Sequence, residues 1–342
     1  MQLVNIMITA VNAVLPITLL ILLGYFLKRI RLITEGFIKV GNDLVFKLAL
    51  PCMLFVNVYS IESFSVIHWD IIGYIMAMLV IIFVLGFFTA VFTTKVPERR
   101  GVIWQCCFRS NFAIIGLSLA STLGGSEAMG VAAVISAFSI PVINIMGVIA
   151  LTVFKNTSDE LSKNIKNIII NVFRNPLIIG VALGCVCLGI RAWQVRVFGK
   201  VVFSLENDLK FFYSALESLK SLTTPLALIV LGGQFEFSAI RGLLKDITVG
   251  TTWRIVIAPL LGVGVAALLS TYTDILSCGV NEYPALVALF GSPVAVSSAI
   301  MADSMGNDGQ LAAQLLVWSS VCSIVTIFLT ACILIACGLL PM

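Results

Sequence analysis

The chain has 342 residues, of which 60% are hydrophobic and only 11% are charged, and its formal net charge is +4. A soluble domain carries roughly 25% charged residues, so this composition excludes a water-soluble globule, and the absence of low-complexity tracts excludes a disordered or fibrous chain. Because a membrane-spanning helix needs about 20 apolar residues, the hydrophobic content is enough for roughly ten spans. The sequence therefore predicts an all-α polytopic membrane protein.

Ten apolar runs follow one another along the chain. The positive charges of the first run, residues 3–27, come after it, whereas a signal peptide has them before its apolar core. We therefore interpret the first run as an uncleaved transmembrane helix. The other runs lie at residues 36–58, 70–94, 101–122, 129–154, 169–190, 211–233, 248–270, 282–303 and 310–339.

The basic residues indicate how these spans are oriented. With the N-terminus outside, sixteen of the 21 Lys and Arg residues lie in or beside inner connections, and we count Arg109 and Arg254 among them. An excess of Lys and Arg on the cytoplasmic side is the usual pattern of membrane proteins. We therefore predict a multi-pass protein of the cell membrane with both termini on the extracytoplasmic side. The remaining five basic residues cluster around the connection between the sixth and seventh spans: Arg191, Arg196, Lys200, Lys210 and Lys220.

The two halves of the chain have matching residue spacings. The matched residues are Pro16 with Pro176, Gly24 with Gly184, Asp43 with Glu217, and Pro51 with Pro225. Because each half has an odd number of spans, the second copy enters the membrane in the opposite orientation. Inverted repeats of this kind are typical of secondary transporters. We predict a first five-helix repeat at 1–154, a cytoplasmic linker at 155–168 and a second five-helix repeat at 169–342.

The fourth and ninth runs contain polar and helix-breaking residues at membrane depth. The fourth contains Asn111, Gly116 and Ser118, and the ninth contains Gly291–Pro293, whose proline lacks an N–H group. Irregular backbone in a membrane persists only beside a cavity or a partner, and free N–H groups at helix N-termini bind anions. A simple proline kink with an interhelical Asn hydrogen bond stays open as the alternative. Since these spans are almost free of formal charge, we expect an anion site built from backbone dipoles, Asn and Ser more than from Lys or Arg.

Four strings of the sequence resemble the auxin efflux carrier family. They are SNFAIIGLSLA (110–120), RNPLIIGVALG (174–184), TPLALIVLGGQF (224–235) and GSPVAVSSAIMADSMGNDGQLAAQLLVWSS (291–320). The resemblance covers essentially the whole chain. It implies ten transmembrane helices in two inverted repeats, with broken fourth and ninth helices that cross, as in the fold shared by bile acid and auxin carriers. It also implies a scaffold domain, a transport domain and alternating access.

The resemblance assigns site residues by motif. Asn111, Gly116 and Pro293 match the crossover positions, and Asn144 matches a polar position that lines the site. Ser118 stands where the family has proline, so the break there is expected to be milder, and its hydroxyl can serve the substrate or its own helix. With Gly291 and Ser292, these residues form our candidate substrate-binding set.

Two acid–base pairs are candidates for gating or coupling. Asp43 and Lys47 are spaced i,i+4, and Glu217 and Lys220 are spaced i,i+3, so each pair can close on one helix face. Charges within a membrane are costly and are often functional. Snorkelling of these side chains to the interface stays open as the alternative.

Other charged residues receive more ordinary expectations. Asp303 and Asp308 follow the ninth run and are expected in water at the inner face. Arg254 can neutralise a substrate carboxylate, although pairing with Asp246 or with a headgroup phosphate is the more ordinary expectation. No carboxylate is evident at the crossing, which favours a proton or no coupling ion over sodium.

Together these features predict a secondary-active transporter of small organic anions, namely carboxylates, that works by alternating access and is proton-coupled or a uniporter. A sodium-coupled symporter and a non-transporting membrane sensor are the alternatives. An enzyme is not expected, because the sequence has no H-E-x-x-H motif and no G-x-S-x-G motif with a histidine partner. We expect the anion and the lipid bilayer as partners, no nucleic acid, no metal and no cofactor. A homodimer stays open.

Overall fold

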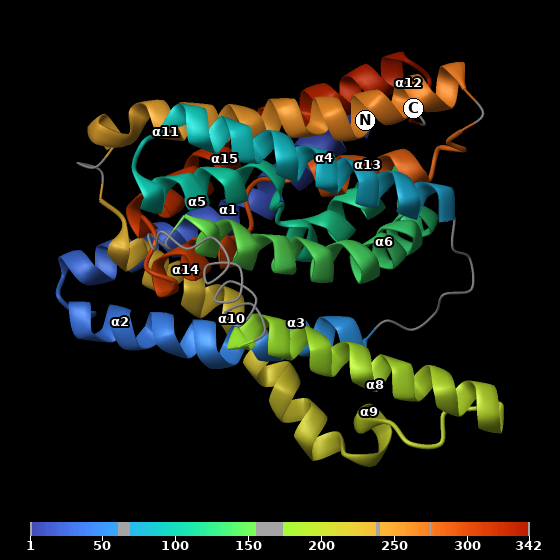
Figure 1. Ribbon diagram of the computed structural model, residues 1–342, viewed down its shortest axis with the longest axis horizontal. Coiled ribbons are helices and arrows are strands. Elements are labelled where there is room, and N and C mark those ends of the chain that lie inside the picture. Colours follow the sequence, from blue (N-terminus) through green and yellow to red (C-terminus); the bar gives the residue numbers. More distant parts are fainter. Residues whose placement is uncertain (1, 61–68, 155–173, 237–239, 274, 341–342) are drawn as a thin grey trace, which may run out of the picture.

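The computed structural model describes residues 2–60, 69–154, 174–236, 240–273 and 275–340 (Figure 1). In these ranges the regular elements are helices, apart from one isolated β-bridge between Ser110 and Val294. The first half contains α1 (Gln2–Arg29), α2 (Glu35–Leu44), the π-helical turn η1 (Val45–Ala49), α3 (Leu50–Tyr59), α4 (Trp69–Thr93), α5 (Pro97–Phe108), the π-helical turn η2 (Phe112–Gly116) and α6 (Leu117–Val153). The second half contains α8 (Pro176–Phe198), α9 (Leu205–Asp208), α10 (Lys210–Gln234), α11 (Ile240–Thr252), the π-helical turns η4 (Trp253–Ile257) and η5 (Leu260–Gly264), α12 (Val265–Tyr272), α13 (Glu282–Gly291), α14 (Val296–Ser304) and α15 (Gly309–Ala336).

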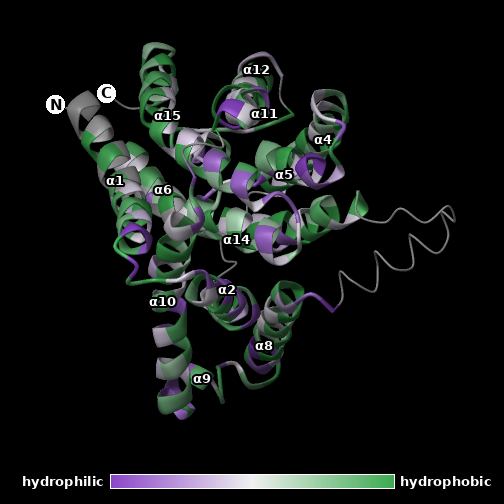
Figure 2. Ribbon diagram, turned by 90° about the vertical axis from the view of Figure 1, so that its left-hand side faces the viewer, coloured by the Kyte–Doolittle hydropathy of each residue, from purple (hydrophilic) through white to green (hydrophobic). Residues whose placement is uncertain are grey.

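Seven helices in the described ranges are long and apolar enough to cross a membrane. They cover Glu35–Tyr59, Trp69–Thr93, Leu119–Val153, Pro176–Phe198, Lys210–Gln234, Ile240–Tyr272 and Gly309–Ala336. Figure 2 shows that hydrophobic residues dominate most of these helices. The prediction of an all-α polytopic membrane protein is therefore confirmed, while the count of ten spans stays a prediction.

Local sequence signals set several helix ends. The Asn175 side chain accepts a hydrogen bond from the Leu177 N–H at 2.9 Å, and Pro176 supplies a preset φ at the first position of α8. The same helix ends at Gly199, whose φ of 70° favours glycine. Within α6, Gly125 has a φ of 75° and breaks the helical path. This glycine separates the end of the fourth predicted run from the fifth run.

Glycines allow two helix pairs to approach closely. A Cβ added at Gly24 of α1 would lie 2.1 Å from the Ile229 carbonyl oxygen of α10. A Cβ added at Gly184 of α8 would lie 3.0 Å from the Phe55 carbonyl oxygen of α3. Gly24 and Gly184 occupy matched positions in the two halves, and Ile229 and Phe55 each lie four residues after a matched proline. These equivalent contacts support the predicted relation between the halves, which stays a prediction.

The helices form two groups in Figure 1. The α2–α3 segment, α8 and α10 lie in the lower part of the view, and α4, α5, α6, α11, α12, α13 and α15 lie in the upper part. Helix α14 lies between the two groups and contacts α10, η1 and α2 as well as α15 and α5. A site at the N-terminal end of α14 is therefore bordered by both groups. The predicted linker at 155–168 lies outside the described residues.

Candidate functional site

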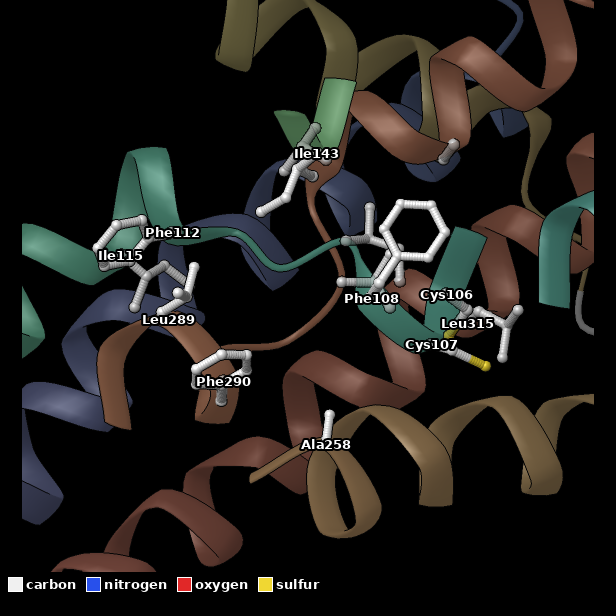
Figure 3. Packing of buried hydrophobic residues seen from close by; sticks show 14 of the residues in the cluster. Cys106, Cys107, Phe108, Phe112, Ile115, Ile143, Ala258, Leu289, Phe290 and Leu315 are labelled. Atoms are coloured by element: carbon white, nitrogen blue, oxygen red, sulfur yellow. The ribbon is translucent and has the colours of Figure 1, made fainter. Parts of the chain in front are cut away.

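Two helix breaks cross near the centre of the molecule. Helix α5 ends at Phe108 and η2 begins at Phe112, while α13 ends at Gly291 and α14 begins at Val296. The Asn111 N–H donates to the Pro293 carbonyl at 2.8 Å, and the Ala295 N–H donates to the Arg109 carbonyl at 3.3 Å. In Figure 3 the segment between Phe108 and Phe112 passes the segment that follows Phe290. Each break therefore satisfies backbone groups of the other, as membrane depth requires.

The break in the fourth span lies earlier than Gly116 and Ser118, between the end of α5 at Phe108 and the start of η2 at Phe112. Gly116 ends the turn η2, and helix α6 continues from Leu117, so this stretch is helical. A Cβ added at Gly116 would lie 2.1 Å from the Phe112 ring, so this glycine makes room for an aromatic side chain. The side chain of Ser118 lies outside the described residues, and its predicted role stays a prediction. The position of the break is set by the backbone partner at Pro293, which local sequence does not reveal.

The ninth span breaks where the sequence predicted. Pro293 has no N–H, and its carbonyl oxygen accepts from Asn111. The hydroxyl of Ser292 is fully buried and donates to the Ala288 carbonyl at 2.5 Å within its own helix. Gly291 is the last residue of α13. These three residues therefore build the break itself.

A cavity lies beside the crossing, where about 40 Å³ is open to the centres of water-sized molecules. A single water needs roughly 10–15 Å³ by this measure, so the space suits a small polar group such as a carboxylate. Of our candidate substrate-binding set, Asn111 and Asn144 line it, whereas Gly116, Gly291, Ser292 and Pro293 are not among its lining residues. The lining residues are Leu50, Met53, Leu54, Arg109, Ser110, Asn111, Phe112, Ile140, Ile143, Asn144, Thr223, Thr224, Ala227, Ala295, Val296 and Ser297.

Arg109 brings a positive charge to this cavity. Its side chain is 2% exposed, and its Nη2 donates to Asn144 Oδ1 at 2.8 Å and to Ser297 Oγ at 3.0 Å. The Asn144 amide is held in place because its Nδ2 donates to the Ile140 carbonyl at 2.8 Å. Within the described ranges, no carboxylate lies within ion-pair distance of Arg109. Its Nη1 also donates to Met301 Sδ at 2.7 Å, so each of these partners is neutral and the positive charge of the guanidinium remains available to attract an anion.

Helix dipoles add to this positive potential. The cavity is lined by Asn111 and Phe112 at the start of η2 and by Ala295, Val296 and Ser297 at the start of α14. The N-terminal end of a helix carries partial positive charge and free N–H groups. The helical segments that follow the two breaks, η2 and α14, therefore both favour an anion in this cavity. The expected backbone dipoles are present. Arg109, which the sequence interpretation placed in an inner connection, also lines this cavity.

The sequence interpretation placed Arg109 in an inner connection because a charge beside an apolar run usually marks the end of a span. The spacing of Arg109 from the start of the span is the signal that could have indicated its depth. Arg109 lies about 12 residues after Pro97, which begins α5, and a helix rises about 1.5 Å per residue. Arg109 therefore lies about 18 Å along the helix axis from the start of α5, more than half of the roughly 30 Å thickness of a hydrocarbon layer.

The remaining charged residues differ from their expected places. Arg254 is 1% exposed and donates to backbone carbonyls instead of pairing with Asp246. Asp246 instead accepts from Arg99 at 3.3 Å, and Arg99 also pairs with Asp308 at 3.0 Å. Asp308 further caps α15 by accepting from the Leu311 N–H at 2.9 Å. The expectation that Asp308 is simply hydrated is wrong, because it ties α15 to α5.

Asp303 also has protein partners. Its Oδ2 accepts from Gln234 Nε2 of α10 at 2.9 Å and from Asn42 Nδ2 of α2. The side chain is half-buried at the end of α14. Asp303 therefore joins α14 to the group formed by α2 and α10, and the expectation that it sits in water is wrong.

Both predicted acid–base pairs form. Lys47 Nζ lies 3.0 Å from Asp43 Oδ2, and Lys220 Nζ lies 3.2 Å from Glu217 Oε1. The Asp43–Lys47 side chains are more than half exposed, and Glu217 also accepts from Tyr213 Oη at 3.2 Å. The spacing thus predicted the contacts correctly, while their role as gates stays a prediction.

Comparison with known proteins identifies the family. The model of a family described as "Membrane transport protein" matches residues 9–331, which is nearly the whole chain. No curated protein matches the chain significantly. This family includes the auxin efflux carriers, so the resemblance seen in the four sequence strings is confirmed. The chain therefore belongs to the membrane transport protein family and is an integral membrane transporter.

Proposed function

We propose that this transporter carries small organic anions, with a carboxylate bound to Arg109, and that it is a secondary-active carrier. The observation that carries this proposal is the buried guanidinium, whose partners Asn144 and Ser297 are both neutral. Guanidinium groups bind carboxylates through parallel charge-assisted hydrogen bonds. The N-terminal ends of η2 and α14 support the same charge preference.

The arrangement of the cavity supports alternating access as its mechanism. Its lining comes from α3 and α10 on one side and from η2, α6 and α14 on the other. If the helices on one side of the cavity slide against those on the other, access to Arg109 therefore changes while both helix breaks keep their structure. The two backbone hydrogen bonds across the crossing, Asn111 to Pro293 and Ala295 to Arg109, allow the crossing to move as one unit.

We further propose that transport is proton-coupled or uncoupled. Within the described part of the chain, the residues lining the cavity include no Asp or Glu. Sodium sites are usually built from carboxylate, carbonyl and hydroxyl oxygens, and a positive guanidinium beside the cavity disfavours a second cation there.

An uptake panel in proteoliposomes tests the proposed substrate class. Radiolabelled mono- and dicarboxylates are offered with and without imposed pH and sodium gradients, and a neutral analogue of each substrate serves as the control. We expect saturable uptake of at least one carboxylate and none of its neutral analogue. Saturable uptake confined to neutral or cationic solutes would overturn the proposal.

The two acid–base pairs give a separate prediction. Asp43→Asn and Glu217→Gln should each slow transport several-fold. An ion pair that forms in one state of the transport cycle stabilises that state, so removing the pair lowers the population of that state. Their effect on the melting temperature should be small, since exposed ion pairs contribute about 0–1 kcal/mol to stability. Transport rates and melting curves of the purified variants check this.

Glu35→Gln is the matched control for the pairs. Glu35 forms an exposed ion pair with Lys28 at 2.7 Å but has no proposed gating role. This control should transport like the wild type. If Asp43→Asn and Glu217→Gln do so as well, the gating hypothesis fails.

A further inference from the structure

Arg254 lies where the first halves of both broken helices end. It belongs to the turn η4 and is among the largest fully buried side chains described. Its Nη1 donates to the Cys107 carbonyl of α5 at 3.4 Å. Its Nη2 donates to the Leu289 carbonyl of α13 at 3.4 Å and to the Phe290 carbonyl. One guanidinium thus joins the C-terminal ends of α5 and α13.

On α13, each of these carbonyls has lost its ordinary helical partner. In a helix, a carbonyl accepts from the N–H four residues later. Leu289 would accept from Pro293, which has no N–H. Phe290 would accept from Val294, whose N–H donates to Ser319 Oγ at 3.1 Å instead. Arg254 therefore satisfies carbonyls that the break leaves free.

The same is true on α5. Cys107 would accept from the Asn111 N–H, which donates to the Pro293 carbonyl across the crossing. The crossing thus creates free carbonyls on both helices at once. These free carbonyls all lie close to the Arg254 guanidinium, so they converge on a single point.

Converging free carbonyls at helix C-termini form a cation site. The C-terminal end of a helix carries partial negative charge, and two such ends meet here. In other secondary transporters, unwound carbonyls and half-helix C-terminal ends coordinate the coupling ion. Here the site holds a cation attached to the chain, and within the described residues no carboxylate pairs with it.

We propose that Arg254 is a tethered cation that fills, at the C-terminal ends of α5 and α13, a site for a monovalent inorganic cation such as sodium. This inference deepens the proposed function, because it assigns sodium independence to the transport cycle. The crossing then has two fixed positive groups with different tasks. Arg109 faces the N-terminal ends and the substrate, and Arg254 neutralises the C-terminal ends.

The test compares Arg254→Ala, Arg254→Lys and Arg254→Met with the wild type. Purified proteins are assayed for carboxylate flux and for melting temperature in sodium, potassium, choline and guanidinium chlorides, at millimolar concentrations and constant ionic strength. The wild type should be insensitive to the choice of cation. Arg254→Ala should lose flux about tenfold in choline, and should recover flux and melting temperature in guanidinium and in sodium. Arg254→Lys should retain flux, and the neutral Arg254→Met should lose it.

Lys245→Ala is the matched control. Lys245 also donates to a backbone carbonyl, that of Thr93 at 2.6 Å, but its side chain is exposed and does not contact the broken ends of α5 and α13. This variant should show neither a loss of flux nor a response to guanidinium.

Three outcomes would overturn the inference. One is wild-type flux that is lost when choline replaces sodium. Another is equal flux in Arg254→Lys and Arg254→Met, which would show that the charge is unimportant even if Arg254→Ala fails to fold. The third is an Arg254→Ala protein whose flux and melting temperature respond to no cation. Because the melting measurements need no substrate, they also separate failure of this inference from failure of the carboxylate assignment.

Discussion

Replacing Arg109 by glutamine is expected to reduce carboxylate uptake by about 10- to 100-fold, since a hydrogen bond to a charged group is worth about 1.5–3 kcal/mol. Arg109 is the one charged residue among the described residues that line the cavity. A glutamine keeps some hydrogen-bonding capacity toward Asn144 and Ser297 but removes the charge that attracts the anion. Initial rates in proteoliposomes, measured over a range of substrate concentrations, check the expected loss.

The same substitution should leave the melting temperature without substrate unchanged or raise it. A buried charge with no charged partner is costly, so its removal relieves the folded state of a desolvation cost. Lost flux together with retained stability is the signature of a binding residue, whereas a structural residue would lose both. Substrate should stabilise the wild type and not the variant.

Two further variants make this result specific. Arg109→Lys keeps the charge but not the planar fork, so its uptake should lie between those of the wild type and the glutamine variant. Arg100→Gln is the matched control, because Arg100 donates to the Thr94 carbonyl at 2.9 Å and does not line the cavity. Wild-type uptake by Arg109→Gln would exclude Arg109 as the substrate contact.

The sequence was informative where the chemistry is local. Pro293 lacks an N–H in any fold, so a break in the ninth span was predictable. Asn111 and Asn144 are amides in apolar runs, and the resemblance to a known family also marked them. The i,i+4 and i,i+3 spacings predicted the contacts of the two acid–base pairs. Each of these predictions depends on neighbours within a few residues.

The charged residues of the crossing were not predictable in the same way. A charge in an apolar run normally marks the end of a span, because burying it alone is unfavourable. Arg109 is tolerated because Asn144 and Ser297, which lie 35 and 188 residues away in the sequence, surround it. Arg254 is tolerated because two helix breaks leave carbonyls free. Composition and spacing do not reveal such distant compensation.

The glycine contacts between helices give the other large expected effect, on stability. Gly24→Ala should lower the stability of the purified protein by about 2–3 kcal/mol, the upper part of the range for an overpacked site. The added Cβ would lie 2.1 Å from the Ile229 carbonyl oxygen, and backbone cannot move aside by changing a rotamer. Helices α1 and α10 would have to separate along their contact.

The distances at the corresponding glycine and at a control glycine predict a graded series of stability losses. Gly184→Ala should destabilise less, because its Cβ would lie 2.8 Å from the Val58 Cβ and 3.0 Å from the Phe55 carbonyl oxygen. Gly189→Ala, on the same helix α8, meets nothing within 4 Å and should be neutral or slightly stabilising, since alanine favours a helix by up to about 1 kcal/mol over glycine. Melting temperatures in detergent check the order.

A different order of melting temperatures among the three glycine variants would change how the helix contacts are interpreted. If Gly24→Ala were as harmless as Gly189→Ala, α1 and α10 would not approach as closely as the structure places them. If Gly24→Ala were harmful and Gly184→Ala harmless, only one of the two matched contacts would bear on stability, and the packing argument for inverted repeats would lose its support. Losses at both positions, with none at Gly189, would be expected if α1 packs on α10 as α8 packs on α3. The two halves would then share a packing rule as well as a pattern of residues.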